Sequence, residues 1–217
     1  MHPVSIGALA FSACYLYSPR GTGPVSACSR LLRAGLKTAS GETLARAATR
    51  VREQFAERRQ FAWVFGADVV LVPVPTSVAT HCAAVWASAD LARSLYARGL
   101  AGGVWTGLRR ARTVRKSATA PHGERPTVEE HYASFAVQAA PWSAGGMLGR
   151  IVLVDDVVTK GRTLLAAALR LREAFPQAQI RAFALFRTLG RVERLERLLA
   201  PCEGEIRWVG DDAYREP

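Results

Sequence analysis

The chain has 217 residues, of which 49% are hydrophobic and 22% charged; this balance is typical of one folded globular domain and argues against a disordered chain. Its 29 lysines and arginines outnumber its 18 aspartates and glutamates, so the formal net charge is +11. Such a charge favours anionic partners, either phosphorylated metabolites or nucleic acid. The excess is almost entirely arginine, which a biased composition explains equally well.

The four cysteines are far apart and form no C-x-x-C pair. The sequence therefore indicates neither a zinc site nor a dense disulfide framework, and we expect reduced thiols in a cytoplasmic protein. The apolar run from Ile6 to Tyr17 is too short to cross a bilayer, and no other segment approaches the roughly 20 apolar residues of a membrane span. We expect no membrane partner.

The first third of the chain predicts one strand and two helices. The run from Ile6 to Tyr17 reads as a strand, and Ser26 is placed to cap a helix that runs through Leu36 toward Gly41. Residues 43–60 predict a second helix, because Leu44, Ala47, Ala48, Val51 and Phe55 recur at helical spacing.

The middle third contains a clear strand and a long stretch without periodicity. Residues 69–75, VVLVPVP, have the length and composition of a buried strand, and a helix is expected from about Ala83 to Tyr96. Val104–Leu108 is a further expected strand, residues 109–130 a long functional or disordered loop, and Tyr132–Val137 an edge strand. Residues 141–149 form a turn-rich connection.

The last third alternates strands with helices. The expected elements are strand Ile151–Val154, helix Arg162–Phe175, strand Ile180–Phe186, helix Val192–Leu199 and strand Glu205–Val209. Near-continuous aliphatic strands that alternate with helices predict an α/β fold, with an open, mostly parallel sheet covered by helices on both faces. We expect a single domain over residues 1–217, with N-terminal strand and helices in 1–65, a core in 66–190 and a C-terminal helix and strand in 191–217.

The stretch Ile151 to Leu164, IVLVDDVVTKGRTL, carries the strongest functional signal. In open parallel sheets the ligand crevice lies beyond the carboxyl ends of the strands, which places Asp155 and Asp156 at the mouth of a site. The following turn enters a helix whose N-terminal amides suit a phosphate. The candidate phosphate-binding residues are Val157, Val158, Thr159, Lys160, Gly161, Arg162 and Thr163. Carboxylates for sugar hydroxyls beside a phosphate cradle would suit a sugar phosphate; the alternative is an acidic pair that only caps a helix, with the cations solvated.

This stretch resembles the phosphoribosyl-diphosphate (PRPP) motif of the type I phosphoribosyltransferases, an aliphatic strand followed by two acids and a T-x-G-x-T loop. Within that family the chain looks most like the competence protein F branch, over roughly residues 30 to 190. The further matches are LLRAGLK at 31–37, VVLVPVPTS at 69–77, LRRARTVRKSAT at 108–119 and ERPTVEEHYASFAV at 124–137. The sequence departs from the family pattern at VWAS, residues 85–88, and at Lys116.

The resemblance implies a type I phosphoribosyltransferase fold that binds PRPP with Mg²⁺ and displaces pyrophosphate from the anomeric carbon. Asp155 and Asp156 would hold the ribose 2′ and 3′ hydroxyls and stabilise the positive ring, and residues 157–163 would hold the 5′-phosphate. A loop of Pro75, Thr76 and Ser77 would meet the pyrophosphate. A flexible lid would carry Arg109, Arg110, Arg112, Arg115 and Lys116. The Mg²⁺ ion would bind chiefly through the diphosphate, with Asp155 and Asp156 as the alternative protein ligands.

Other functions stay open at this point. The same pocket suits a non-catalytic sensor of PRPP or a nucleotide, coupled to DNA uptake or repair, and the net charge alone suits a nucleic-acid-binding protein. A homodimer is also open. The feature that separates an enzyme from a sensor is an acceptor pocket, which the sequence does not reveal. His81, His122 and His131 lack metal-ligand spacing, and Glu129 and Glu130 are expected to face solvent.

Overall fold

A seven-stranded sheet runs through the molecule in the strand order β3-β2-β6-β7-β1-β8-β9. The computed structural model describes residues 6–38, 41–56, 58, 61–79, 86–115, 125–139, 149–190 and 194–216. The strands of this sheet are β1 (Leu9–Tyr17), β2 (Gly66–Pro73), β3 (Ala101–Val104), β6 (Arg150–Val158), β7 (Gln179–Thr188), β8 (Leu199–Val209) and β9 (Asp212–Glu216). A separate antiparallel pair joins β4 (Leu108–Arg110) to β5 (Phe135–Val137).

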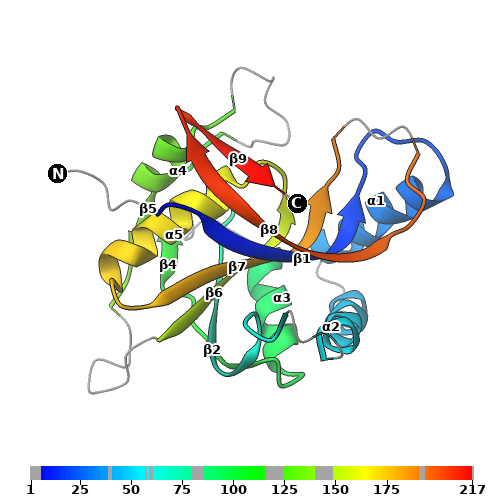
Figure 1. Cartoon of the computed structure of the whole chain (residues 1–217), viewed down its shortest axis with the longest axis horizontal. Coiled ribbons are helices and arrows are strands. Elements are labelled where there is room, and N and C mark those ends of the chain that lie inside the picture. The colour runs from blue at the N-terminus through cyan, green and yellow to red at the C-terminus, as the bar shows by residue number, and fades with distance from the viewer. Residues whose placement is uncertain are drawn as a thin grey trace.

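The sheet is mostly parallel, as predicted. Strands β3, β2, β6, β7 and β1 pair in parallel, whereas β8 and β9 add antiparallel pairs at the β1 side. The helices of the described residues are α1 (Pro24–Lys37), α2 (Gly41–Ala56), α3 (Ala87–Tyr96), α4 (Val128–Ser134) and α5 (Arg162–Ala174). Figure 1 shows α2 and α3 on one side of the sheet and α4 and α5 on the other. The α/β class and the helix-covered sheet are therefore confirmed.

Each face of the sheet has its own apolar core. On one face α5 buries Leu164, Leu165 and Leu169 against β-strand residues such as Leu153 and Ala182. On the other face α2 and α3 cover an aromatic cluster in which Phe55 contacts Phe61, with ring centroids 4.5 Å apart, and Phe183, at 5.7 Å. The five apolar positions read from the α2 sequence are all buried. These two cores fix the strands whose carboxyl ends carry the candidate site.

Two N-terminal elements begin at other residues than expected. Helix α1 begins at Pro24, where the fixed φ of proline suits the first helical turn, so Ser26 lies inside the helix instead of capping it. The Ser26 hydroxyl accepts a hydrogen bond from the Leu195 amide at 3.4 Å. The first strand begins at Leu9, later than the Ile6 expected from the apolar run.

The stretch expected to form an edge strand, Tyr132–Val137, is half helical and half strand. Residues Val128–Ser134 form α4, and only Phe135–Val137 form the strand β5. A capping box explains this: the Glu130 amide donates to the Thr127 hydroxyl at 3.1 Å, and the Thr127 amide donates to the Glu130 carboxylate at 2.7 Å. The expected loop at 109–130 is therefore shorter at both ends, and the expected strand at Val104–Leu108 is split between β3 and β4.

The expected helix at Val192–Leu199 is wrong for its described part, because residues 194–198 are not helical and strand β8 begins at Leu199. Pairing with β1, which joins Tyr15 to Leu199 and Leu9 to Ile206, satisfies the backbone of both strands. The predicted strand at 205–209 is the end of β8, and the hairpin partner β9 was not expected. None of the helices in the described part of the chain is long and apolar enough to span a membrane.

Gly161 stands where the β6–α5 turn, residues Thr159–Gly161, meets the β8–β9 hairpin. Its φ is 89° and its ψ is 8°, in the left-handed region, and a Cβ atom there would lie 2.6 to 2.8 Å from the Ile206 side chain. Gly210, in the β8–β9 turn, also has positive φ, at 62°, but a Cβ there meets no atom within 4 Å.

We predict that Gly161→Ala lowers the free energy of unfolding by about 2–4 kcal/mol, through backbone strain plus overpacking against Ile206. Gly210→Ala is the matched control and should cost only the strain, about 1–2 kcal/mol. Urea unfolding of both variants measures the difference. Equal losses would show that the contact with Ile206 is not tight.

Candidate functional site

The two adjacent acids lie inside the carboxyl-terminal half of β6, not beyond its end. The ladder with β7 continues past them, pairing Asp155 with Ala184 and Val158 with Arg187. The expectation that the strand ends at Val154 is therefore wrong, and Val157 and Val158 are strand residues that pack into the two cores. Both acids stay partly exposed, as residues at the edge of a crevice should be.

Asp155 and Asp156 have different surroundings. The Asp156 amide donates to Asp155 Oδ1 at 2.8 Å, but burial, reinforced by repulsion from Asp156, raises the pKa of Asp155 well above its ordinary value of 3.8. The Asp156 carboxylate lies 3.4 Å from Arg33 Nη2. Of the two neighbours, Asp156 has a cationic partner and Asp155 resists ionisation, an asymmetry typical of functional carboxylate pairs.

Arg33 lies in the matched stretch at 31–37, but no role for it was predicted from the sequence. It comes from α1, and its Nη1 donates to the Tyr17 hydroxyl at 3.3 Å while the guanidinium lies 4.8 Å from the centroid of the Tyr17 ring. Tyr17 is the last residue of β1. No local pattern reveals this contact, because it depends on how α1 packs over the carboxyl end of the sheet.

The β6–α5 turn has the backbone of an anion cradle. Left-handed Gly161 is the N-cap residue of α5, no side chain in the described chain caps that helix, and its first turn carries no acid. The Thr159 hydroxyl lies 3.2 Å from that of Thr188, and the Thr163 hydroxyl lies 3.4 Å from His131 Nε2. The uncapped amides at the positive end of the helix suit a phosphate group.

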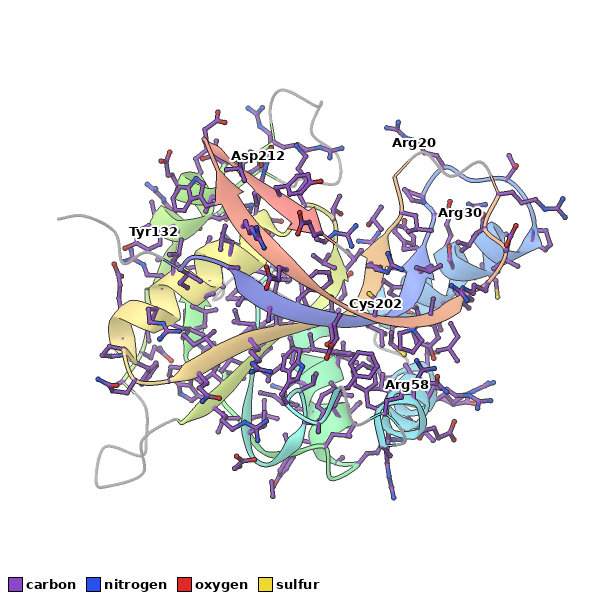
Figure 2. The ribbon with its side chains drawn as sticks, in the orientation of Figure 1. Arg20, Arg30, Arg58, Tyr132, Cys202 and Asp212 are labelled. Carbon is purple, nitrogen blue, oxygen red and sulfur yellow. The ribbon has the colours of Figure 1, made fainter. Side chains whose placement is uncertain are left out.

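The two cations of this turn are engaged by one acid from the far end of the chain. Asp212 of β9, labelled in Figure 2, accepts from Lys160 Nζ at 2.6 Å and from Arg162 Nη2 at 2.8 Å, and also from Arg162 Nε. The Arg162 hydrogen bond, followed by that of Lys160, holds the pKa of Asp212 well below its usual range. Phosphate affinity at this turn should therefore depend on the amides and hydroxyls more than on these two charges.

Arg110 is a buried anchor and not a mobile lid residue. Its Nε donates to the Thr76 carbonyl, its Nη1 donates to the Ser134 hydroxyl, and its guanidinium lies 4.2 Å from the centroid of the Phe135 ring. Burial lowers its pKa to about 10, although Asp155 opposes that shift. The arginine thus ties the Thr76 segment to Ser134 of α4 and Phe135 of β5.

The structure brings the predicted diphosphate loop and the base of the predicted lid together. The Val114 amide donates to the Ser77 carbonyl at 2.8 Å, and the Ala79 amide donates to the Thr113 hydroxyl at 3.0 Å. Pro75 is buried, whereas Thr76 and Ser77 are partly exposed. These contacts hold residues 75–79 beside residues 110–114.

Beyond this base, the predicted lid residues separate into two groups. Arg109 lies on β4, donates to Gln138 Oε1 at 3.2 Å and stacks 5.9 Å from the Trp86 ring. Arg112 and Arg115 line a cavity of about 760 Å³ together with Arg125, whose carbonyl accepts from Arg162 Nη1 at 3.3 Å. Lys116, like His81 and His122, lies outside the described residues.

His131 is a second residue whose role the sequence did not indicate. It is buried on α4, and burial, reinforced by Arg110 and Arg162, lowers its pKa to about 3. The imidazole is therefore neutral at pH 7 and lies against the Thr163 hydroxyl. Its placement between two arginines arises only in the folded chain.

The VWAS departure has a structural role in its described part. Trp86 Nε1 and Ser88 Oγ both donate to the Val74 carbonyl, at 2.8 and 2.6 Å. They satisfy the backbone where β2 leads into Pro75, while Val85 lies outside the described residues. The departure thus supports the segment that was predicted to meet pyrophosphate.

Comparison with known proteins gives no assignment: no protein-family model matches the chain, and no curated protein does. The site must be interpreted from its own geometry. Among the described residues, no group of three or more His, Cys, Asp or Glu side chains could hold a metal ion by itself.

We predict that Asp155→Asn raises the melting temperature at pH 7. The folded state keeps the Asp155 proton to a higher pH than the unfolded state does, so stability falls as pH rises above 3.8 through the folded pKa. The asparagine does not ionise and so avoids this loss of stability. The difference in melting temperature should disappear below pH 3.8, where Asp155 is protonated in both states. Thermal melts from pH 3 to 8 test this, with the exposed Asp211→Asn as control; a loss of stability at pH 7 would contradict it.

A second prediction concerns Asp212, whose carboxylate is 28% exposed. Asp212→Asn keeps an acceptor for the Ala213 amide but loses the charge between Lys160 and Arg162. We expect a loss of about 1–2 kcal/mol in unfolding free energy and faster amide exchange at residues 161–165. Its neighbour Asp211→Asn should change stability by less than about 0.5 kcal/mol. Similar effects from both variants would remove Asp212 as the anchor of the turn.

Proposed function

We propose that this chain has a type I phosphoribosyltransferase fold, binds PRPP with Mg²⁺ and transfers its phosphoribosyl group to an acceptor, with release of pyrophosphate. The carrying observation is that the Thr76 segment lies at the same edge of the sheet as Asp155, Asp156 and the β6–α5 turn, although it is distant from them in sequence. The Val74 amide donates to the Val154 carbonyl at 2.9 Å, Arg110 donates to the Thr76 carbonyl, and the turn follows β6 directly. These parts supply donors and acceptors for the sugar and for the phosphates of a sugar diphosphate.

The ribose would lie against β6. Asp155 and Asp156 would accept hydrogen bonds from the 2′ and 3′ hydroxyls, which lie on adjacent carbons and so suit adjacent carboxylates. As the bond from the anomeric carbon to the diphosphate breaks, positive charge grows on the ring. A carboxylate that is poorly solvated beforehand gains most from that charge, because the electrostatic interaction is stronger where water is excluded.

The two phosphate ends would be held by different groups. The uncapped amides of α5 and the hydroxyls of Thr159 and Thr163 suit the 5′-phosphate. The cavity of about 760 Å³ that Arg112, Arg115 and Arg125 line suits the diphosphate, whose charge these cations would offset as it departs. The contacts of Val114 with Ser77 fix the base of that cavity to the loop at residues 75–77.

The donor set fits Mg²⁺ bound mainly by substrate. This ion is usually held by one or two carboxylates plus substrate phosphates, and Asp155 and Asp156 are adjacent and partly exposed. When bound, the ion would neutralise part of the diphosphate charge. The protein's own contribution is to position the sugar and to exclude water from the ring.

A sensor without transferase activity is the second candidate, and one contact favours it. Arg33 already pairs with Asp156 at 3.4 Å, with only 16% and 20% of the two side chains exposed. A guanidinium fixed beside the Asp156 carboxylate would offset its negative charge, so this carboxylate would stabilise a cationic ring less. A sensor would use the same pocket to bind PRPP and leave it intact.

The test is pyrophosphate release from PRPP and Mg²⁺ with a panel of nucleobases and small amines. We predict release with at least one acceptor, and its loss in the double variant Asp155→Asn, Asp156→Asn, since amides keep the shape but not the charge. Asp211→Asn should retain wild-type turnover. Because Asp156→Asn breaks the ion pair with Arg33, a thermal melt of the double variant is needed to show that lost activity does not come from unfolding.

Calorimetry of PRPP binding separates the remaining outcomes. Binding without release across the panel would favour the sensor. No binding of PRPP by the wild type, or equal binding by the double variant, would overturn the assignment of the carboxylates for both candidates.

A further inference from the structure

Two arginines at the carboxyl edge of the sheet have no role in the site described above. Arg187 is the penultimate residue of β7 and pairs in register with Val158 of β6 and Leu16 of β1. Arg215 comes from β9, where it pairs with Ile206 of β8. The central strand β7 and the edge strand β9 therefore each contribute a guanidinium near the β6–α5 turn.

The Arg215 side chain is held in place by the backbone of this edge. Its Nε donates to the Thr159 carbonyl at 2.7 Å and its Nη2 donates to the Thr188 carbonyl at 2.8 Å. Its guanidinium lies 5.7 Å from the centroid of the Phe11 ring. The hydroxyls of the same two threonines lie 3.2 Å apart. Arg215 is thus fixed to the backbone of both threonines before any ligand arrives.

Both arginines retain donors that have no acceptor among the described residues. Arg187 Nε and Arg215 Nη1 are buried and have no hydrogen-bond partner. Among the ion pairs of the described residues, none includes Arg187 or Arg215. Buried donors in native proteins are almost always paired, so two at one edge indicate an absent acceptor.

The two cations are close enough to affect the same groups. Burial, followed by repulsion from Arg187, lowers the pKa of Arg215. Burial raises the pKa of the Cys202 thiol, and both arginines oppose that rise. Cys202, labelled in Figure 2, lies on β8 and pairs with Ala13 of β1. An anion between the guanidinium groups would relieve their repulsion.

We propose that Arg187 and Arg215 form an anion-binding site for a phosphate or carboxylate group. Guanidinium N–H donors match the oxygens of either anion, and charge-assisted hydrogen bonds of this kind are the strong ones. A cavity of about 350 Å³, which Lys160 and Asp212 also line, opens beside Arg215, between Thr159 of the turn and Tyr214 of β9. It leaves room for an organic group attached to the anion.

This site does not depend on the proposed transferase function. The anion could be a free phosphate, the acid group of a second ligand, or part of the sugar phosphate itself. Arg215 also donates to the Thr159 carbonyl. An anion bound here would therefore contact a side chain that holds the β6–α5 turn. Any of the three sources uses the same donors.

The direct test follows the side-chain Nε–H signal of Arg187 by NMR while inorganic phosphate is added to the ¹⁵N-labelled full chain. The signal is assigned by its loss in Arg187→Lys. We expect a saturable downfield shift, because the unpartnered Nε–H gains an acceptor. The Nε–H of Arg207, which donates to Glu205 at 3.1 Å, is the internal control and should not move. An unmoved Arg187 signal, while other signals saturate, would overturn the proposal.

Thermal melts of Arg187→Met give an independent readout. In phosphate-free buffer the variant should melt above the wild type, since it removes an unpaired cation, and its phosphate affinity should be about tenfold weaker or more. Arg207→Met should keep the wild-type phosphate response. A variant that melts below the wild type and responds to phosphate unchanged would indicate a structural role only.

Repeating the titration with PRPP and Mg²⁺ present identifies the source of the anion. Phosphate that still shifts the Arg187 signal would be a separate ligand, whereas PRPP that shifts it and excludes phosphate would supply the anion itself. If PRPP does not bind, the phosphate titration still decides whether the anion site exists. Failure of the anion site is therefore distinguishable from failure of the proposed function.

Discussion

The carboxylate of Asp212 is the contact on which the candidate site most depends. It holds both cations of the β6–α5 turn, while Ile206 leaves room there only for glycine and Arg215 binds the Thr159 carbonyl. All three residues belong to the β8–β9 hairpin. The shape of the turn is therefore imposed from outside its own sequence, and the amides at the start of α5 stay available because the hairpin, and not a local cap, sets their direction.

Unfavourable electrostatics are concentrated at one edge of an otherwise well-packed fold. Asp155 resists ionisation, burial keeps His131 neutral, and Arg187 and Arg215 have donors without an acceptor among the described residues. The cores on both faces bury mainly aliphatic and aromatic groups, although the buried Ser12 hydroxyl on β1 also has no partner in the described part of the chain. Proteins keep such conflicts where a ligand or a reaction relieves them.

The features that could be predicted from the sequence are those that neighbouring residues determine. The aliphatic run of β6, the helical spacing of α2 and the glycine before α5 each depend on local geometry, and the fold class followed from them. The failures were non-local. Residues 194–199 have helical spacing, but pairing with β1 makes Leu199 the start of a strand. Likewise, no pattern near Lys160 reveals its acid partner on β9, and none near Asp156 reveals Arg33.

The position of β1 has a consequence for how the molecule is made. This first strand lies between β7 and β8, so Phe11 meets Ala182 on one side and Gly204 on the other. During synthesis it has neither neighbour until residues 179–209 have left the ribosome, and such long-range pairing is slow to form. The parallel strands β2, β3 and β6 can assemble earlier. Both cores and the ligand edge therefore wait for the later strands, since Phe11, Ala182 and Phe183 belong to those cores.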